Sequence, residues 1–479
     1  MRGPVEVEAG RTPRGAAAVG GASNGCVVMK FGGTSVGNAA AIERVAAIVS
    51  SRLKRRPVVV VSALAGTTNL LLGIARSAAA GELLGALQQV ESLRERHLRE
   101  AAALLGTGPE ADEVQADLSV MCDELAGLVH ALSVLRYLTP RSEDAIAAYG
   151  EQMSSRLVVA VFRARGIPAE LVDAREVIVT DDSFTRAAPR MDALERSVRE
   201  RVGRVLAAGG VPVLGGFIGA TEDGVTTTLG RGGSDYSAAL VGAALGAEAI
   251  EIWTDVAGML TADPRVVPEA RLLEHVRFDE ASELAAFGAK VLHPATLKPA
   301  VDRGIPVCIF NTFDPDGSGT WITESAPLRR VSAIAARTGV TVIRVRSTKM
   351  LLAHGFMHAL FEVFERHQTA VDVVATSEVS VSVTVNDSSK LDAIVADLEK
   401  LGEVSVERGR AVIAIVGSAL DGDSAILARA LLALGGAKVH MISLSSTGIN
   451  LTLVVDAEGL ESTLRKLHSE FFLAMPAVA

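Results

Sequence analysis

The chain has few cysteines, no excess of positive charge and no long apolar run. Its three cysteines, Cys26, Cys122 and Cys308, are scattered and odd in number, which predicts neither a disulfide framework nor a metal site and fits a reducing cytoplasm. Basic residues number 47 against 56 acidic ones, and the net charge of −9 argues against nucleic acid or an anionic membrane as a partner. No apolar run reaches about 18 uninterrupted residues, so no transmembrane helix is expected.

The length and apolar content indicate a globular protein of several domains. A chain of 479 residues is too long for a single core, and an apolar fraction of 49% is ample for two or more. Residues 1–25 differ, because they are rich in Gly, Ala, Arg and Pro and follow no periodic pattern. We interpret them as a disordered tail and expect no signal peptide, since no continuous apolar stretch follows the charges.

From Val27 to about Ala295, short β-branched runs alternate with longer helical patterns. This alternation predicts an α/β fold in which helices sandwich a sheet. The charged stretch between Leu70 and Leu138 has almost no β-branched runs, and we interpret it as a helical lobe, with a plain spacer as the alternative. The predicted strands are Val58–Val61, Val211–Leu214 and Ala249–Trp253, and the predicted helices are Ala39–Leu53, Met191–Ala207 and Ser237–Leu245.

After Leu328 the pattern changes, and one order of elements occurs twice. Each copy runs strand, helix, strand, strand, helix, and similar turns occur at 373–381 and 442–450. Two βαββαβ units predict a duplicated, ferredoxin-like module that binds small molecules. The predicted strands are Val340–Val345, Ala370–Thr376, Val379–Val385, Val412–Val416, Val439–Leu444 and Ile449–Val455, and the helices are Gly355–His367, Ser389–Leu401, Ser424–Leu434 and Leu460–Phe471.

A compact anion site is predicted near the start of the α/β region. The hexapeptide Lys30–Ser35 places a lysine, two glycines and two hydroxyls after the apolar run Cys26–Met29. Glycines let backbone amides approach an anion closely, and lysine supplies a point charge for phosphate. The residue order is not that of the common P-loop. A second glycine-rich segment, Thr226–Asp235, ends in Gly-Arg-Gly-Gly-Ser-Asp and strengthens the prediction.

Several side chains offer the charge neutralisation and positioning that phosphoryl transfer needs. Lys30 suits the transferred phosphate, and Asp235 suits a partner that holds this lysine in place. Arg231 offers a planar fork for a carboxylate and Glu151 a partner for an ammonium, so the two together fit a zwitterionic amino acid. Two hydroxyls after the predicted strand at 58–61 suit substrate oxygens, namely Ser62 and Thr68.

Each of these residues also has an ordinary structural interpretation. Glu151 alone fits a solvated helix carboxylate, Asp235 an N-cap and Arg231 a surface charge. His293 is better explained by capping or packing than by catalysis, because a carboxylate nucleophile is already ionised at neutral pH and needs no base. The functional interpretation gains weight because the glycine-rich pair and the Thr-Asp…Asp-Pro-Arg segment at 254–265 occur together on one α/β frame.

Together these segments resemble the aspartate kinases, members of the amino acid kinase family, from about Val27 to the C-terminus. The resemblance implies an amino acid kinase-like αβα sandwich with a helical lobe, followed by two ACT domains. The implied ranges are 26–300 for the catalytic domain, 301–337 for a linker and strand, 338–408 for the first ACT domain and 409–479 for the second. Because strands can be exchanged between paired ACT domains in this family, 330–336 is expected to belong to the second.

The resemblance also implies a role for individual positions. Lys30 and Asp235 fall on catalytic positions, and no metal ligand from the chain is expected although Mg²⁺ would accompany ATP. Leu260 stands where many members have tyrosine, so apolar packing rather than an aromatic contact is expected there. The implied aspartate pocket contains Ser62, Thr68, Glu151, Arg231 and Ser234. The implied ATP site contains Lys30, Phe31, Gly32, Gly33, Ser35, Thr254, Asp255, Leu260, Arg265, Lys290 and Val291.

The C-terminal half resembles that of the single-function, lysine-sensitive aspartate kinases. Lysine is therefore the first effector to consider, and the resemblance implies a homodimer formed through the ACT domains. Ala353 departs from the lysine-sensitive pattern, which often has serine there. Modules that serve only dimerisation are the alternative. The implied effector positions are Met350, Gly355, Phe356, Met357, Val371, Asp372 and Glu378.

The expected activity is ATP-dependent phosphorylation of the β-carboxylate of L-aspartate, which gives 4-phospho-L-aspartate and ADP and begins aspartate-family amino acid biosynthesis. The carboxylate is expected to attack the γ-phosphorus in line, without an enzyme-bound intermediate. Two alternatives stay open, namely another amino acid kinase that acts on glutamate or acetylglutamate, and a catalytically silent amino-acid sensor. The sequence fixes neither the effector nor the downstream pathway.

Overall fold

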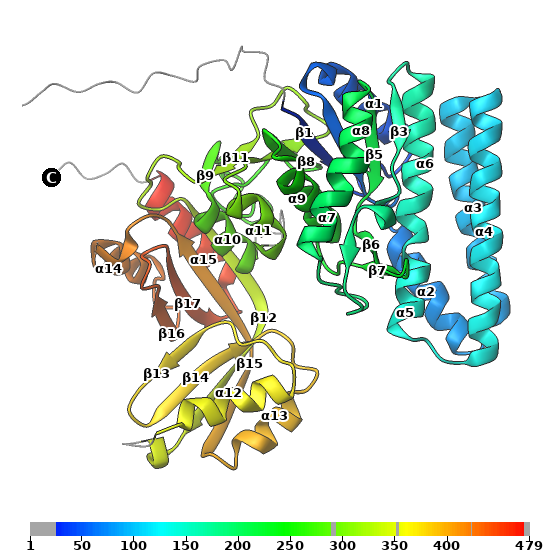
Figure 1. Ribbon diagram of the computed structural model, residues 1–479. Coiled ribbons are helices and arrows are strands. Elements are labelled where there is room, and N and C mark those ends of the chain that lie inside the picture. Colours follow the sequence, from blue (N-terminus) through cyan, green and yellow to red (C-terminus); the bar gives the residue numbers. More distant parts are fainter. Residues whose placement is uncertain (1–24, 289–293, 351–353, 423, 474–479) are drawn as a thin grey trace, which may run out of the picture.

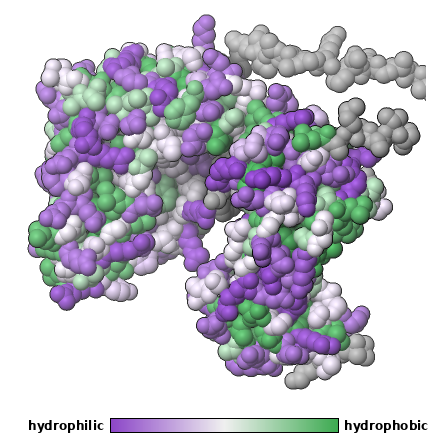
Figure 2. Space-filling model, turned by 180° about the vertical axis from the view of Figure 1, so that it is seen from behind, coloured by the Kyte–Doolittle hydropathy of each residue, from purple (hydrophilic) through white to green (hydrophobic). Residues whose placement is uncertain are grey.

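The computed structural model describes residues 25–288, 294–350, 354–422 and 424–473. Nearly all of the tail predicted at 1–25 lies outside these residues. Figure 1 shows two parts, an α/β region flanked by long helices and a C-terminal region built on a second sheet. Polar residues are spread over the face of both parts seen in Figure 2, with smaller apolar areas between them.

The α/β region is built on a sheet of eight strands in the order β3-β5-β2-β1-β8-β10-β11-β9. From β3 to β10 neighbouring strands pair in parallel, and β11 pairs antiparallel with β10. Every residue of β1, β2 and β5 is buried, as expected for strands covered on both faces. The bounds are Val27–Phe31 (β1), Pro57–Val61 (β2), Ala169–Leu171 (β3), Val211–Gly215 (β5), Ala249–Thr254 (β8), His275–Arg277 (β9), Val307–Asn311 (β10) and Thr320–Thr323 (β11).

Helices cover the two faces of this sheet, and alternate strand residues belong to two different cores. Val27 and Met29 of β1 pack in one core with α1 and α6, whereas Val28 packs in the other with α9. The predicted αβα sandwich is confirmed. The helices are α1 (Ala39–Ser51), α5 (Pro140–Ala147), α6 (Tyr149–Ala164), α7 (Met191–Ser197), α8 (Gly203–Ala207), α9 (Gly233–Leu245), α10 (Phe278–Ala286) and α11 (Pro294–Asp302), with short turns η1 (Leu53–Arg55), η2 (Ala174–Glu176) and η3 (Val198–Val202).

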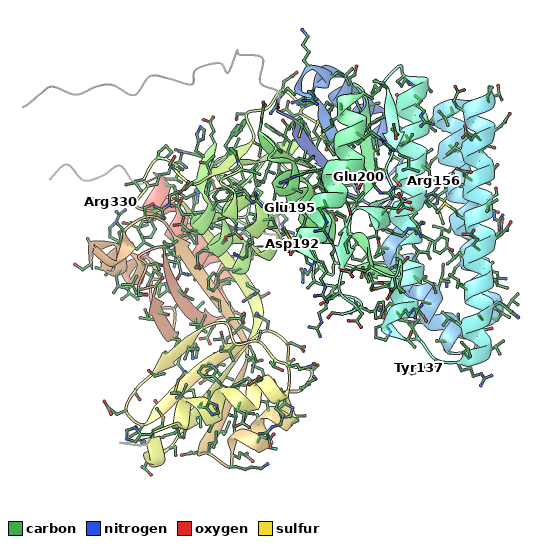
Figure 3. All side chains as sticks on the ribbon, in the orientation of Figure 1. Tyr137, Arg156, Asp192, Glu195, Glu200 and Arg330 are labelled. Carbon is green, nitrogen blue, oxygen red and sulfur yellow. The ribbon has the colours of Figure 1, made fainter. Side chains whose placement is uncertain are left out.

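The predicted helical lobe is also present. It contains α2 (Thr67–Ala79), α3 (Leu83–Leu105) and α4 (Pro109–Leu135), and Tyr137 lies at its end (Figure 3). Among the described helices, α4 alone is long and apolar enough to cross a membrane by length and composition. Its buried residues, such as Leu118 and Leu125, pack in one core with residues of α2, α3 and α6. This packing indicates that α4 is a core helix of the lobe.

A small third sheet forms the rim of the α/β region. Its strands are β4 (Val179–Thr180), β6 (Ile218–Thr221) and β7 (Thr226–Thr228), in the order β4-β6-β7. β7 leads directly into the glycine-rich turn before α9.

The C-terminal region is one six-stranded sheet in the order β13-β14-β12-β15-β17-β16. Its central strands, β12 (Ala333–Arg346) and β15 (Glu403–Val416), have 14 residues each and run through both repeats. The first half of β12, residues 333–337, pairs with 412–416, so this segment belongs with the second repeat as expected. The remaining elements are β13 (Val374–Thr376), β14 (Ser380–Val385), β16 (Val439–Leu444), β17 (Asn450–Asp456), α12 (Phe356–Arg366), α13 (Leu391–Leu398), α14 (Ser424–Ala433), α15 (Leu460–His468), η4 (Thr348–Met350), η5 (Leu420–Gly422) and η6 (Ser469–Leu473).

Several predicted bounds need correction. The range 301–337, predicted as a linker and strand, contains two further strands, β10 and β11, which extend the eight-stranded sheet. The boundary predicted between residues 408 and 409 falls inside β15, since hydrogen bonds to neighbouring strands continue along its length. The helix predicted at 237–245 begins earlier, at Gly233. The strand predicted at 370–376 is shorter, and only 374–376 is assigned to β13.

Candidate active site

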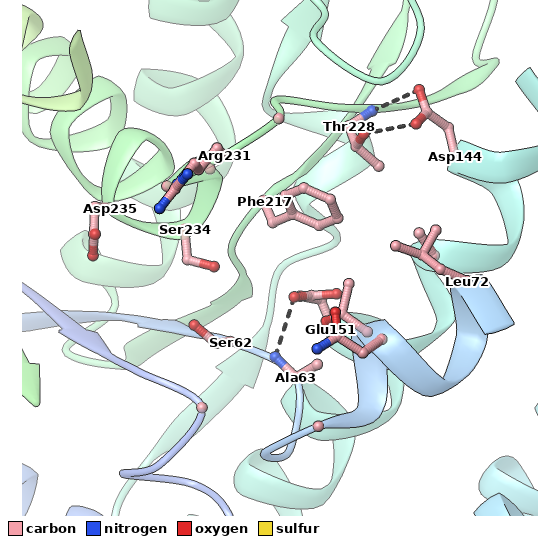
Figure 4. Close-up of a pocket in the computed structure, with 18 of the residues that line it drawn as sticks. Ser62, Ala63, Leu72, Asp144, Glu151, Phe217, Thr228, Arg231, Ser234 and Asp235 are labelled. Carbon is pink, nitrogen blue, oxygen red and sulfur yellow. Dashed lines mark hydrogen bonds between the residues drawn. The ribbon is translucent and has the colours of Figure 1, made fainter. Parts of the chain in front are cut away.

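A cleft of about 520 Å³ opens where β1, β2 and β5 end. In a parallel sheet the carboxyl ends of neighbouring strands meet at one edge, and ligands of α/β proteins bind there. All of the predicted substrate-binding and catalytic side chains line this cleft (Figure 4). They are Lys30, Ser62, Thr68, Glu151, Arg231, Ser234 and Asp235.

Lys30 and Asp235 form an ion pair inside the cleft. Lys30 Nζ lies 2.6 Å from Asp235 Oδ1, and both side chains are largely shielded from solvent. Lys30 is the fourth residue of β1 and is buried. Asp235 lies in the first turn of α9, after the N-cap residue Gly232, so its interpretation as an N-cap is wrong. The pair matches the predicted arrangement, in which a carboxylate holds the lysine.

The glycine loop after β1 is held by the end of β8. Gly32 N donates to the Trp253 carbonyl at 3.1 Å, and Ser35 Oγ donates to the same oxygen at 3.2 Å. Ser35 Oγ also lies 2.7 Å from Thr312 Oγ1. Gly33 lines the cleft, and a Cβ at this position would lie 3.2 Å from the Ala63 carbonyl oxygen. The loop is therefore held by its neighbours, and a side chain at Gly33 would be tightly packed against the Ala63 carbonyl.

Two residues predicted to bind ATP have buried side chains that do not line the cleft. Phe31 is fully buried, and its ring stacks on Trp253 with 6.0 Å between centroids. Ser35 is 1% exposed, and its hydroxyl makes the hydrogen bonds described above. Both side chains support the loop from within the core. Any contact they make with a ligand would come from their backbone.

Glu151 is the most perturbed acid of the cleft. It lies in the first turn of α6 and is only 3% exposed, so its interpretation as a solvated carboxylate is wrong. Its Oε1 accepts a hydrogen bond from Ala63 N at 3.2 Å, and no described residue partners the buried Oε2. Burial raises the pKa of Glu151 to about 8, and the bond from Ala63 N opposes this only in part. A cationic group in the cleft would relieve this burial penalty.

Arg231, in the glycine-rich turn before α9, and Ser234, in the first turn of α9, line the same cleft as Glu151 (Figure 4). Gly230 and Gly232 have φ values of 75° and 73°, a region that L side chains rarely adopt. Arg231, between them, is exposed and has no ion-pair partner among the described residues. The cleft thus has a free guanidinium on one wall and a buried carboxylate on the other.

Hydroxyls of the β2–α2 turn complete the cleft. Ser62 N donates to the Phe31 carbonyl at 3.0 Å, which ties the end of β2 to the end of β1. Thr68 lies in the first turn of α2, after the N-cap Gly66. Both residues were predicted from their position after a buried strand. Their location at the cleft agrees with that argument.

Sequence reasoning missed two residues that shape the cleft. Asp144 of α5 accepts hydrogen bonds from Thr185 N at 2.8 Å and from Thr228 N and Oγ1 at 3.0 and 2.6 Å. Phe217 has a φ of 67° and lies beside the start of α9. Nothing in the residues around Asp144 distinguishes it from other helix acids. Phe217 could have been found, because it follows the buried strand β5, as Ser62 follows β2.

Four other residues predicted to bind ATP do not line the cleft: Thr254 ends β8, and Asp255, Leu260 and Arg265 follow it. We call the connection between β8 and β9, residues 255–274, the β8–β9 segment. Thr254 Oγ1 donates to Asp255 Oδ1 at 3.1 Å, and Arg265 is bound to Asp263 at 2.5 Å. Leu260 forms a bridge with Leu272. Lys290 and Val291, like His293, lie outside the described residues.

The predicted effector residues divide into two groups. Met350, Phe356, Met357 and Val371 pack against the core of the first repeat. Gly355, Asp372 and Glu378 are exposed. Gly355 is the N-cap of α12, with a φ of 85°. Asp372 Oδ1 lies 3.4 Å from Arg337 Nη2, and its Oδ2 accepts from Asn386 at 2.5 Å, so this carboxylate already has partners. Ala353 lies outside the described residues.

No protein-bound metal centre is evident in the described ranges. They contain no group of three or more His, Cys, Asp or Glu side chains placed to hold an ion. Mg²⁺ commonly keeps several waters and binds through substrate phosphates and one or two carboxylates. The acids of the cleft are Glu143, Asp144, Glu151 and Asp235, and no three of them are placed to hold an ion, so the cleft fits an ion that arrives with a nucleotide better than a resident one.

Comparison with known proteins places the chain in a family. A model of the amino acid kinase family matches residues 25–311, and a model of the ACT domain matches 413–471. Lysine-sensitive aspartokinase 3 of Escherichia coli is 37% identical over 458 residues, covering 93% of this chain and 99% of that protein. The chloroplastic aspartokinase 3 of Arabidopsis thaliana is 37% identical over 469 residues, covering 93% of this chain and 81% of that protein.

Solved structures agree with the sequence comparison. Aspartokinase III of E. coli in complex with aspartate and ADP, in its R-state, superposes with a TM-score of 0.83 at 36% identity, over 93% of this chain and 100% of the other. The T-state of the E. coli enzyme, in complex with lysine and aspartate, gives a TM-score of 0.78 at 36% identity, over 93% and 99%. With a family model over more than half of its length and relatives over nearly all of it, the chain belongs to the amino acid kinase family, among its aspartokinases.

Proposed function

We propose that this chain is an aspartate kinase, which transfers the γ-phosphoryl group of ATP to the β-carboxylate of L-aspartate. The products are 4-phospho-L-aspartate and ADP, and the reaction begins aspartate-family amino acid biosynthesis. The observation that carries the proposal is the cleft itself, in which Lys30, Glu151 and Arg231 converge from three separate elements. A cation for phosphate, an anion for ammonium and a fork for carboxylate are what this reaction requires.

Lys30 supplies the charge that the transferred phosphoryl group needs. Phosphoryl transfer depends on positioning and charge neutralisation rather than on a covalent intermediate. Asp235, at 2.6 Å, fixes the ammonium of Lys30 in the cleft before substrate arrives. The attacking β-carboxylate is ionised at neutral pH, so no general base is required. Gly32 and Gly33 leave the backbone of the loop open to the phosphates.

The amino acid is held at the two walls of the cleft. Arg231 binds the α-carboxylate through its planar guanidinium, and Glu151 binds the α-ammonium. Ser62, Thr68 and Ser234 supply hydroxyls between them. Since burial raises the pKa of Glu151 to about 8, the free enzyme carries this group largely protonated at pH 7. Aspartate then binds with release of a proton, because its ammonium favours the ionised carboxylate.

The nucleotide lies beside the end of β8, against the β8–β9 segment and the glycine loop. Thr254 and the loop are joined through the neighbouring Trp253 carbonyl, which accepts from Gly32 N. Lys290 and Val291 are proposed to border ATP on the strength of the resemblance. Mg²⁺ would accompany ATP and would supply positive charge that neutralises the phosphates.

The two other candidate functions fit the cleft less well. N-acetylglutamate has no free ammonium. In an acetylglutamate kinase the buried carboxylate of Glu151, whose Oε2 has no partner among the described residues, would therefore have no cationic group to bind. A silent sensor would have no use for the ion pair of Lys30 and Asp235. The test is a phosphorylation assay with aspartate, glutamate and N-acetylglutamate, each with and without lysine. Turnover of aspartate alone supports the proposal, and turnover of either other acceptor in its place contradicts it.

Regulation is proposed to act through the C-terminal sheet. Lysine is the first effector to test, with its carboxylate at the turn before α12 and its ammonium at Asp372 and Glu378. Asp372 would have to exchange Arg337 or Asn386 for the effector. A homodimer formed through this region, as the resemblance implies, is testable by light scattering. The three cysteines are free and buried, which fits the proposed cytoplasmic location.

A further inference from the structure

A hydrogen bond between two side chains joins the C-terminal sheet region to the β8–β9 segment. Thr261 Oγ1, in that segment, lies 2.9 Å from His468 Nε2, at the last residue of α15. The two residues are 207 positions apart, and they are 4% and 0% exposed. Loss of this bond would leave a buried polar atom without a partner, which costs free energy.

His468 has little else to bind. Its ring stacks on Phe472 with 4.6 Å between centroids, and its Nδ1 has no hydrogen-bond partner among the described residues. Burial lowers the pKa of His468, which keeps the imidazole neutral near pH 7. Thr261 Oγ1 already accepts a hydrogen bond from Arg271 N at 2.9 Å, so its own hydrogen is available to His468 Nε2.

Further contacts hold residues 261–267 against the C-terminal region. The Thr261 carbonyl accepts from Ile334 N of β12 at 2.8 Å, and the Val266 carbonyl accepts from Arg465 Nε of α15 at 2.8 Å. Ala262 and Val267 are buried in one apolar cluster with Leu467 and other residues of the second repeat. Residues 261–267 are therefore fixed at both ends, and Asp263 and Arg265 project from the turn between them.

We propose that His468 is a positioning residue for nucleotide binding, through its hydrogen bond to Thr261. The C-terminal module then forms the back of the nucleotide site and sets the position of Arg265 and its neighbours. This inference rests on the proposed function, in which the β8–β9 segment contacts ATP. Loss of the bond weakens the binding of ATP and leaves the aspartate pocket, which lies at the ends of β1, β2 and β5, unchanged.

A matched pair of substitutions separates the hydrogen bond from general packing. In His468→Gln the side-chain terminus reaches the position of Nε2, whereas in His468→Asn it reaches only that of Nδ1. We expect His468→Asn to raise the KM for ATP about threefold to tenfold, the range for one lost hydrogen bond, with kcat and the KM for aspartate within about twofold of wild type. We expect His468→Gln to restore most of the affinity for ATP. Thr261→Val should match His468→Asn, and Thr261→Ser should match wild type.

A control variant tests whether loosening of α15 alone has the same effect. Thr463→Ala removes another buried hydroxyl from α15, one that donates to Gly459 O within the helix. It should lower the melting temperature without changing the KM for ATP. If His468→Asn behaved like this control, or raised the KM for aspartate as much as that for ATP, the inference would be wrong.

Calorimetric titration of ADP separates this inference from the proposed function. If wild type binds ADP but phosphorylates no aspartate, the proposed function fails, and weaker ADP binding by His468→Asn still supports the inference. If wild type is active and His468→Asn binds ADP as tightly, the inference alone fails. If wild type binds no ADP, both are overturned.

Discussion

At the residue scale, the proposed phosphoryl transfer depends most on Lys30, which pairs with Asp235. Lys30→Ala should lower kcat about 10²-fold to 10³-fold, because it removes the charge that faces the transferred phosphoryl group. Circular dichroism should show an unchanged fold, since the removed ammonium reaches into the cleft. The kinetic constants of the purified variant test this prediction. Retention of more than about a tenth of wild-type kcat would contradict the proposed role of Lys30.

Replacement of Arg231 by another cation is expected to weaken aspartate binding. Arg231→Lys should raise the KM for aspartate much more than that for ATP, because a point ammonium cannot reproduce a planar, two-pronged contact with a carboxylate. Initial-rate kinetics with each substrate varied in turn measure both constants. A change confined to the KM for ATP would place Arg231 in the wrong pocket.

Removal of the Glu151 charge is expected to have opposite effects on stability and on activity. Its folded-state pKa of about 8 lies above the usual value of 4.5, so the folded protein binds this proton more tightly than the unfolded chain does. Its contribution to stability is therefore fully present below about pH 4.5 and is lost as the pH rises through 8.

Glu151→Gln keeps a neutral, hydrogen-bonding group at every pH. Its melting temperature, relative to that of wild type without substrate, should rise as the pH increases from 4 to 9, while its KM for aspartate increases. Calorimetric scans across this range measure the first effect and initial rates the second. A melting-temperature difference independent of pH would mean that Glu151 is ionised throughout.

At the element scale, the turn after β5 must lie very close to the start of α9. A Cβ at Gly216 would lie 2.8 Å from Ser234 Cα, which is closer than real contacts permit. Gly216→Ala should therefore push the first turn of α9, with Ser234 and Asp235, away from the cleft. We expect a lower kcat and a higher KM for aspartate, measured by initial rates.

Gly73→Ala in α2 is the matched control, because a Cβ there meets nothing within 4 Å. It should keep wild-type kinetics and gain slightly in melting temperature, since alanine favours a helix more than glycine does. Equal kinetics for the two variants would mean that the close approach at Gly216 has no part in the site.

Much of the fold follows from local sequence patterns, and the exceptions have physical causes. The runs at 58–61, 211–214 and 249–253 are mostly apolar and contain β-branched residues, and each forms a buried parallel strand. β10 and β11 were missed as members of the catalytic sheet, because only the tertiary pairing of 307–311 with β8 reveals their sheet. β12 and β15 are longer than their apolar runs, since neighbouring strands continue to pair with their polar ends.

The site was predictable where function requires an unusual residue at a strand end. Lys30, Ser62 and the glycine-rich turn at 230–233 show such signals, and the structure brings them into one cleft. Phe31 and Ser35 belong to the same motif, yet their side chains turn into the core, because successive residues of strand and turn face different ways. Asp144 and His468 form hydrogen bonds with residues distant in sequence, and no local pattern marks either of them.

At the scale of the whole molecule, the C-terminal sheet contacts the α/β region where the nucleotide is proposed to bind. Besides the bond of Thr261 and His468, Ser332 and Ser418 donate to the buried Glu280 of α10 at 2.9 and 3.1 Å. A ligand can shift the balance of two states only by as much as its affinities for them differ. An effector that changes the C-terminal sheet would therefore act on the proposed ATP site through these contacts.

Asp372→Ala tests the effector assignment. The residue lies outside the α/β region, so uninhibited kcat should stay near that of wild type, while inhibition by lysine is relieved. Dose–response curves with lysine, and with threonine as the comparison effector, measure this. Unchanged inhibition by lysine would move the effector site elsewhere. Calorimetry that shows neither amino acid binding to an active enzyme would mean that the modules answer another metabolite or serve assembly only.

The most direct test of the account identifies the product of wild-type turnover. Hydroxylamine added during the reaction of ATP with L-aspartate traps an acyl phosphate as a hydroxamate, and mass spectrometry with fragmentation distinguishes the β- from the α-hydroxamate. The account predicts β-aspartyl hydroxamate in proportion to ADP, with neither product from Lys30→Ala beyond about a hundredth of the wild-type rate. ADP without hydroxamate, or a hydroxamate of glutamate or N-acetylglutamate in preference to that of aspartate, would contradict it.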